Sequence, residues 1–336
     1  MFRLIKWLFL LALIGALAVA GALYWYVREY IPEFPRGNDT LILQVTPGEG
    51  SKQIAQNIKE LGIDADPNVT ALLFRIKGAD RNLKAGRYEL RSGTTIEGLV
   101  DYIISGRIMR SKITFIEGQV TQRYLDQIAN NPDLEHPIKD ISSGELHDAI
   151  GAPRSQNLEG RFAPDTYTFA NGINDTIILR MAYDEQRKRL KEAWDSRDPD
   201  LTLKSPTELL ILASLIEKET GVDNDRKLVS SVFHNRLKKG MMLQTDPSVI
   251  YGIKDFDGVI RRSHLKTDTP YNTYTRTGLP PTPIANPGKK SLEAAAHPAK
   301  TNYLYFVAKG EGASHFSSTL GEHNRAVQKY LRSQGK

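Results

Sequence analysis

An uncharged apolar run near the N-terminus is the feature that most constrains this chain. Residues 7–27, WLFLLALIGALAVAGALYWYV, contain no charged side chain. At about 1.5 Å per residue, a helix of this length spans roughly 30 Å, which is the thickness of the hydrocarbon core of a bilayer. Trp7 at one end and Tyr24, Trp25 and Tyr26 at the other are typical of membrane interfaces. The run therefore predicts a single transmembrane anchor.

The charges beside this run set its expected orientation. Arg3 and Lys6 precede it, whereas one positive and one negative charge follow it. We therefore expect residues 1–6 in the cytoplasm and the rest of the chain outside the cytoplasmic (inner) membrane. A cleaved signal peptide is an alternative, because Ala18-Val19-Ala20 has the small residues of a cleavage site. A buried helix of a soluble protein is a third interpretation.

Composition bounds the remaining 300 or so residues only broadly. Of the 336 residues, 45 are Lys or Arg and 39 are Asp or Glu, a net charge of +6, and 40% are hydrophobic. These values exclude a wholly disordered chain and a multi-span membrane protein. The absence of cysteine excludes disulfides, thiolate metal sites and thiol nucleophiles. The modest basic excess fits an anionic partner, such as a membrane surface, a cell-wall polymer or nucleic acid.

Three segments in the first half of the chain share one pattern. Residues 43–58, 88–103 and 113–128 each read as a short strand, a turn glycine, a Ser or Thr helix cap and an amphipathic helix. The pattern resembles LysM-like modules, which bind the glycan chains of peptidoglycan, over residues 40–110. A structural spacer is the alternative. Residues 111–157 read as a connecting segment.

The helix predicted over residues 205–221 carries the strongest candidate for chemistry. Ser205 and Pro206 suit its first positions, and Gly221 ends it. Glu217 lies in the last turn, where the helix dipole and the neighbouring apolar residues both favour a protonated carboxyl group. Such a group can protonate the leaving oxygen of a glycosidic bond. Glu219 is the reserve candidate, and two surface glutamates partly neutralised by Lys218 are the alternative.

Residues that suit a sugar follow this helix. A second helix is predicted over residues 223–240, and loops rich in hydroxyl, amide and aromatic side chains come after it. Aromatic rings and amide groups together match the apolar face and hydroxyl rim of a sugar, although ordinary turn chemistry would explain the same loops. The clearest such loop is residues 269–275, TPYNTYT.

Several longer strings resemble the endolytic murein transglycosylases, the YceG-like or MltG-like family. They are EKETG (217–221), LQTDPSVIYG (243–252), PYNTYTRTGLPPTPIANPG (270–288) and GEHN (321–324). A further match, LEGRFAPDTY, begins at residue 158. The resemblance covers nearly the whole chain.

The resemblance implies an activity and assigns residues to it. Members cleave nascent peptidoglycan strands between N-acetylmuramic acid and N-acetylglucosamine and leave 1,6-anhydro ends, without a cofactor or metal. The family's glutamate would fall on Glu217, which would act as general acid and then as base. Glu159 is the candidate for a second carboxylate near the substrate. With the resemblance in view, we expect six residues around the cleft, as sugar contacts or supports: Asn235, Gln244, Asp246, Tyr271, Asn272 and Tyr274. Peptidoglycan synthases as partners follow from the resemblance alone.

Other functions are weighed against this one. A membrane-anchored protein that only binds peptidoglycan would share the anchor, the basic charge and the LysM-like module. A hydrolytic muramidase would leave reducing ends. A metal-dependent hydrolase is not expected because no HExxH or other close ligand spacing occurs. Nucleic-acid binding is not expected because the positive charge is dispersed.

The predicted architecture is α+β, with an anchor over residues 7–27, a LysM-like module over 40–110 and an α+β catalytic domain over 158–333. Tyr303–Ala308 and Ser314–Phe316 read as a hairpin, and a polar helix is predicted from Thr319 to Arg332.

Overall fold

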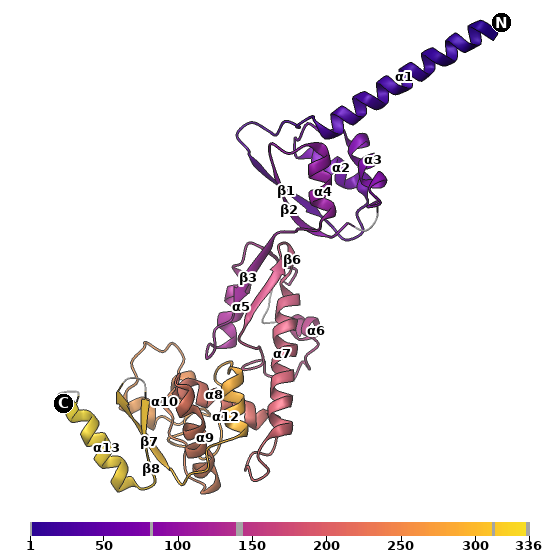
Figure 1. The fold of residues 1–336 in the computed structure, drawn as a ribbon. Coiled ribbons are helices and arrows are strands. Elements are labelled where there is room, and N and C mark those ends of the chain that lie inside the picture. The colour runs from indigo at the N-terminus through magenta and orange to yellow at the C-terminus, as the bar shows by residue number, and fades with distance from the viewer. Residues whose placement is uncertain (1, 81–82, 139–143, 311–312, 334–336) are drawn as a thin grey trace. The chain divides into compact units, whose positions relative to one another are not determined.

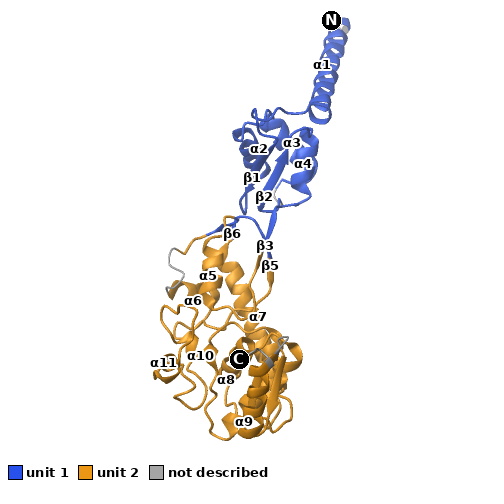
Figure 2. Ribbon diagram, turned by 90° about the vertical axis from the view of Figure 1, so that its left-hand side faces the viewer, with its two compact units in different colours: residues 1–112, 133–135, 168–173 blue, residues 113–132, 136–167, 174–336 orange. Residues whose placement is uncertain are grey.

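The computed structural model describes residues 2–80, 83–138, 144–310 and 313–333. The chain divides into two compact units (Figure 2). Unit 1 contains residues 1–112, 133–135 and 168–173, and unit 2 contains residues 113–132, 136–167 and 174–336.

Unit 1 consists of a long apolar helix and a small α/β module. In the described part of the chain, α1 (Phe2–Arg28) is the one helix long and apolar enough to cross a membrane. In the module, strands β1 and β2 pair antiparallel, with Leu43 opposite Tyr88, and both of these side chains are buried. The elements of the module are β1 (Thr40–Val45), α2 (Ser51–Glu60), α3 (Pro67–Ile76), β2 (Gly86–Arg91) and α4 (Ile96–Ile104).

Local sequence explains where these helices begin. Asp66 caps α3 by accepting hydrogen bonds from the backbone N–H groups of Asn68 and Val69, and proline occupies the first helical position. Thr95 caps α4 in the same way. Ile54, Phe74 and Val100, one from each helix, are fully buried in the core beneath the β1–β2 pair.

Four short strands form two further pairs. β3 (Arg110–Thr114) pairs with β5 (Thr166–Ala170), and β4 (Leu134–Glu135) pairs with β6 (Ile173–Asn174). The three predicted strand–turn–helix segments are observed as β1–α2, β2–α4 and β3–α5 (Thr121–Ala129). The predicted connecting segment holds α5 and α6 (Gly144–Ile150), and most of its residues belong to unit 2.

Unit 2 is built around one buried helix, α8 (Pro206–Glu219), whose residues 209–216 are all buried. Ser205 accepts a hydrogen bond from the backbone N–H of Glu208, as its predicted role as the N-cap requires. Helices α7, α9, α10 and α12 contact α8 (Figure 1). The other elements are α7 (Asp175–Ser196), α9 (Asp223–Lys238), α10 (Asp246–Tyr251), α11 (Arg262–Lys266), α12 (Lys289–Ala296), β7 (Tyr305–Gly310), β8 (Ala313–Ser317) and α13 (Leu320–Ser333).

The predicted hairpin and C-terminal helix are confirmed. β7 and β8 pair antiparallel, and α13 packs against both strands. Residues 311–312, at the predicted turn of the hairpin, lie outside the described residues. This arrangement brings the last thirty or so residues of the chain to the end of α8.

Candidate active site

The two glutamates in the last turn of α8 have different surroundings. Residues two apart on an α-helix project about 200° from each other. Glu219 therefore faces a cavity, whereas Glu217 faces α9 and α12. The core around residues 209–216 fixes the rotation of α8 and therefore the direction of each carboxyl group.

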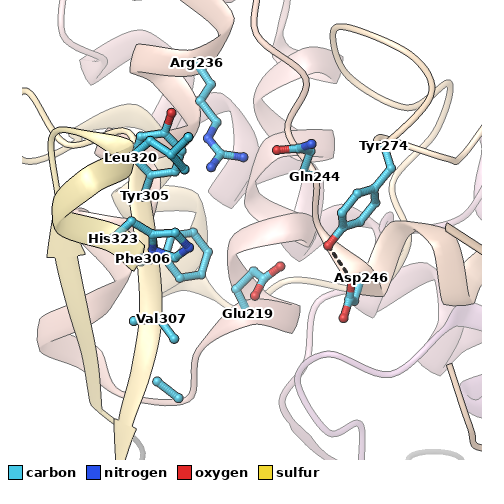
Figure 3. Close-up of a pocket in the computed structure, with 11 residues that line it drawn as sticks. Glu219, Arg236, Gln244, Asp246, Tyr274, Tyr305, Phe306, Val307, Leu320 and His323 are labelled. Carbon is cyan, nitrogen blue, oxygen red and sulfur yellow. Dashed lines mark hydrogen bonds between the residues drawn. The ribbon is translucent and has the colours of Figure 1, made fainter. Parts of the chain in front are cut away.

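The cavity beside Glu219 has a volume of about 460 Å³ and opens to solvent (Figure 3). Side chains from α8, α9, the loop before α10, β7 and α13 surround it. It is lined by Glu219, Arg236, Gln244, Asp246, Tyr274, Tyr305, Phe306, Val307, Ala308, Leu320 and His323.

Glu219 is the carboxyl group best suited to proton transfer in this cavity. Its pKa is raised to about 6, chiefly by burial and also by the nearby Asp246 carboxylate. A hydrogen bond donated by the Thr245 hydroxyl and the charge of Arg236 act in the opposite direction. A pKa near neutrality suits a group that must give up a proton and later take one back.

One wall of the cavity comes from the loop before α10 and the loop that contains Tyr274. The Tyr274 hydroxyl donates a hydrogen bond of 2.6 Å to Asp246 Oδ1, so both side chains are fixed beside Glu219. Gln244 has a φ of +49°, a value that side-chain-bearing residues seldom adopt. Its backbone N–H donates to Thr273 O at 3.0 Å, and its amide points into the cavity (Figure 3). Unusual backbone geometry at a cavity wall is typical of functional sites.

The opposite wall is basic and aromatic. The Arg236 guanidinium donates to Leu304 O at 2.7 Å and to Leu243 O at 2.8 Å, so its position is fixed by two backbone segments. It lies 5.3 Å from the centre of the Tyr305 ring. On α13, His323 stacks on the same ring at 5.2 Å. Burial lowers the pKa of His323, which favours its neutral form at this wall.

Glu217 is held in a buried ion pair. Its carboxylate accepts hydrogen bonds from Ser291 Oγ at 2.7 Å and from the Gly288 backbone N–H at 3.0 Å. Arg226 Nη2 lies 3.6 Å away, and the side chains of Glu217 and Arg226 are each only 6% exposed. Arg226 also donates from Nε to Ser291. Three partners satisfy the charged form of Glu217, and it does not line the cavity around Glu219.

The sequence as a whole matches the model of the YceG-like family over residues 43–329. This chain belongs to the YceG-like family. The family expected from EKETG, LQTDPSVIYG and the other strings is therefore confirmed.

Two relatives of this YceG-like chain have the same name, endolytic murein transglycosylase. It is 32% identical to the endolytic murein transglycosylase of Bacillus subtilis (strain 168), over 94% of this chain and 92% of that protein. It is 25% identical to the endolytic murein transglycosylase of Streptococcus pneumoniae (serotype 2, strain D39), over 98% of this chain but only 65% of that longer protein. A YceG-like protein of Listeria monocytogenes, solved at 2.6 Å, shares the fold. Its TM-score is 0.51 at 28% identity, and the match covers 85% of this chain and 98% of that one.

The fold and class expected for this YceG-like chain are confirmed at a coarse level. The structure is mixed α and β with one apolar N-terminal helix, and the shared fold is that of a YceG-like protein. The name of the relatives is that of a lytic transglycosylase, which confirms at family level the expected class of enzyme.

The predicted substrate residues of this YceG-like chain divide into two groups. Gln244, Asp246 and Tyr274 line the cavity together with Glu219. Asn235 instead donates to Thr301 O and Tyr303 O, both at 2.9 Å, and so ties α9 to the segment before β7. It lines a separate cavity of about 430 Å³.

The other predicted residues support loops. The Asn272 amide donates to the backbone oxygens of His264, Leu265 and Thr267 and is 1% exposed. Tyr271 bonds Thr282 and packs edge-on against Tyr251.

Glu159 is also held within the protein. Its Oε1 accepts from the Thr121 backbone N–H at 2.9 Å, and its Oε2 accepts from the Tyr251 hydroxyl at 3.2 Å. Burial raises the pKa of Glu159, whereas these hydrogen bonds lower it. It does not line the cavity around Glu219.

Sequence reasoning missed one wall of the cavity. Arg236 follows Asn235 directly, so the sugar-like composition nearby was a usable signal for it. His323 lies in the GEHN string, which was a usable signal for it. Tyr305 and Phe306 reach the cavity through the packing of β7 against α9 and α13. Among the described residues, no group of three His, Asp or Glu side chains is placed to hold a metal ion.

Proposed function

We propose that this protein is a membrane-anchored lytic transglycosylase that cleaves peptidoglycan strands, with Glu219 as its general acid and base. The observation that carries the proposal is a glutamate with a pKa raised to about 6, on the wall of an open cavity of about 460 Å³. The chain's close relative in Bacillus subtilis is named for cutting murein, and the cavity offers the amide, carboxylate and aromatic groups that a sugar requires.

The proposal assigns the acid to Glu219 instead of Glu217. A general acid must reach the glycosidic oxygen, and Glu219 lines the cavity whereas Glu217 does not. It must also be protonated in a useful fraction of molecules, which the raised pKa of Glu219 provides. Glu217 pairs with Arg226 and accepts two hydrogen bonds, so its carboxyl group is occupied within the protein. We propose that Glu217 holds α8, α9 and α12 together beneath the site.

The proposed reaction needs one titrating carboxyl group. Glu219 donates its proton to the glycosidic oxygen as the bond from the anomeric carbon to that oxygen breaks, and N-acetylglucosamine leaves with a hydroxyl group. The C6 hydroxyl of the muramic acid then attacks its own anomeric carbon and returns a proton to Glu219. Because the nucleophile is part of the substrate, no water enters and the usual second catalytic carboxylate is not required.

Other cavity residues have supporting roles in this proposal. The negative charge of Asp246 raises the pKa of Glu219 and would stabilise positive charge that develops on a sugar bound in the cavity. The amide of Gln244 and the ring of Tyr305 offer a hydrogen-bonding group and a stacking face for the glycan.

The location of the protein is part of the same proposal. We infer that α1 anchors it in the cytoplasmic membrane with the N-terminus inside, because Arg3 and Lys6 precede the apolar run. The module of unit 1 would then bind glycan as LysM-like modules do. Partner synthases remain a prediction from the family resemblance.

A hydrolytic muramidase is the second candidate, and the presence of Asp246 in the cavity favours it. A second carboxylate could activate water in the cavity, which would leave reducing ends. Mass spectrometry of the products formed from un-cross-linked peptidoglycan separates the two. We expect 1,6-anhydro ends from the wild-type protein and no products from the E219Q variant. Reducing ends from the wild-type protein would show that it is a hydrolase and not a lyase. Glycan binding without cleavage by the wild-type protein would show that it is a peptidoglycan-binding protein.

A further inference from the structure

Helix α3 of unit 1 carries apolar side chains on two faces. Leu73 and Phe74 point inward and are buried in the core of the module. Leu72 and Ile76 point outward and are 49% and 72% exposed. Among the described residues, no other large apolar side chain outside α1 is as exposed as Ile76. The module's own core therefore explains only the inner face of α3.

The outward residues form one stripe. Val69, Leu72 and Ile76 follow each other at spacings of three and four residues, which places them on one side of the helix. Arg75 lies beside the stripe and is exposed. An outward apolar stripe with a long basic side chain at its edge is typical of helices that lie in a membrane interface.

The stripe leads into a groove between α3 and the anchor helix. This groove has a volume of about 720 Å³. Its α1 wall is aliphatic and aromatic, and its other wall comes from the end of α2, the segment between α2 and α3, and the start of α3. Val19, Leu23 and Trp25 line it on one side, and Pro67 and Val69 line it on the other together with Asp66 and the Lys59–Asp64 ion pair.

Specific contacts hold the end of α1 against the module. The Tyr26 hydroxyl accepts a hydrogen bond of 2.8 Å from the backbone N–H of Asp66, the N-cap of α3. Arg28 pairs with Glu97 of α4 at 3.0 Å. These contacts fix the level along α1 at which α3 begins.

That level lies within the apolar run. The run ends at Val27, so at about 1.5 Å per residue Leu23 lies about 6 Å and Val19 about 12 Å inside its outer end. Val69 and Pro67 share a groove with these two residues. A lipid bilayer around α1 therefore reaches the start of α3 and the stripe that continues from it.

We propose that the outer face of α3, through Val69, Leu72 and Ile76, lies in the outer interface of the bilayer and holds unit 1 on the membrane surface. The inference rests on the proposed anchoring by α1. Lipid is the occupant because the groove is continuous with the apolar surface of the anchor. Lys59 and Arg75 pair with Asp64 and Asp80, so the apolar side chains and not these charges favour lipid.

Spin labelling tests this proposal with the full chain, which has no cysteine of its own. Single variants L72C and I76C are labelled with a nitroxide and placed in nanodiscs of equal parts phosphatidylethanolamine and phosphatidylglycerol. L17C reports the anchor. I42C is the matched control, because Ile42 is an aliphatic side chain of unit 1 that is 42% exposed on β1.

We expect labels at positions 72 and 76 to collide more with oxygen than with a water-soluble nickel chelate, as at position 17, and the label at position 42 to show the reverse. Labels at 72 and 76 that behave like the one at 42, while position 17 reports lipid, would overturn the α3 proposal and leave the anchor intact. Protection from both reagents would also overturn it, because a protein partner would then cover the stripe. A water-exposed label at position 17 would contradict the anchoring itself.

Discussion

Glu217 and Glu219 are two residues apart in the last turn of α8, yet Glu217 is paired with Arg226 and only Glu219 lines the cavity. The difference follows from helix geometry, because the two side chains project to opposite sides. One side meets α9 and α12, and the other meets the loop before α10 and strand β7.

The pH dependence of cleavage should respond in opposite directions to two substitutions beside Glu219. The acid form of Glu219 is lost as the pH rises through about 6, so kcat/KM should fall about tenfold per pH unit above that value. D246N removes a charge that raises the pKa of Glu219, so the alkaline limb of the pH profile of kcat/KM should move to lower pH. T245V removes a hydrogen bond that lowers the pKa and should move it to higher pH.

Each shift should be on the order of one pH unit, the effect of one nearby charge or hydrogen bond. T282V is the matched control for T245V, because the Thr282 hydroxyl bonds Tyr271 and does not line the cavity. Identical limbs in D246N, T245V and the wild-type protein would show that Glu219 is not the titrating acid.

Replacing Glu219 by glutamine should stabilise the protein at neutral pH. The pKa of Glu219 rises on folding from an ordinary 4.5 to about 6, so the ionised group opposes folding. The protonated group does not oppose folding. The contribution of Glu219 to the free energy of unfolding is therefore complete below about pH 4.5 and is lost as the pH rises through about 6. E219Q should therefore unfold with a free energy about 2 kcal/mol higher at pH 7, and this gain should shrink toward pH 4.

Urea unfolding followed by circular dichroism at both pH values measures this difference. A loss of stability in E219Q at pH 7 would contradict the claim that Glu219 is buried and that its ionised form opposes folding.

Breaking the ion pair beneath the site should cost stability. In R226M the Glu217 carboxylate stays buried without its cation, and removing one partner of a buried pair costs about 3–5 kcal/mol. The double variant R226M/E217Q should recover part of this loss, because no charge then remains in the pair. Thermal unfolding of R226M, E217Q, the double variant and the wild type gives the double-mutant cycle for this pair. Equal stability of R226M and the wild type would show that the Glu217–Arg226 pair does not stabilise the folded protein.

Gly160, at the start of the predicted catalytic domain, should tolerate no side chain. Its φ is +76°, and an added Cβ would lie 2.6 Å from the Cβ of Pro283 and 3.1 Å from the backbone oxygen of Ala285. Gly278 is the matched control, since its φ is +83° but no atom lies within 4 Å of an added Cβ. G278A should lose only the about 1–2 kcal/mol of a left-handed alanine, and G160A should lose clearly more. Equal melting temperatures would refute the close approach.

Sequence reasoning predicted the helices of unit 2 well because their signals are local. Ser205, Pro206 and the apolar residues after them mark α8, and Gln244, Asp246 and Tyr274 were expected around the cleft once the family resemblance was in view. The choice between Glu217 and Glu219 was not local. It depends on Arg226 and Ser291 on one side and on β7 on the other, which the fold brings to α8 from distant parts of the chain.

The cleavage rates of E219Q and E217Q on un-cross-linked peptidoglycan strands, at matched folded fractions, test the central claim most directly. A general acid contributes about 10²–10⁴-fold to the rate. The kcat of E219Q should therefore fall by a factor of at least about 10², while the variant still binds glycan. E217Q should keep a measurable rate and lose mainly stability, because its glutamine can still accept the hydrogen bonds from Gly288 and Ser291. Full activity in E219Q together with a dead but folded E217Q would contradict this assignment and return the acid to Glu217.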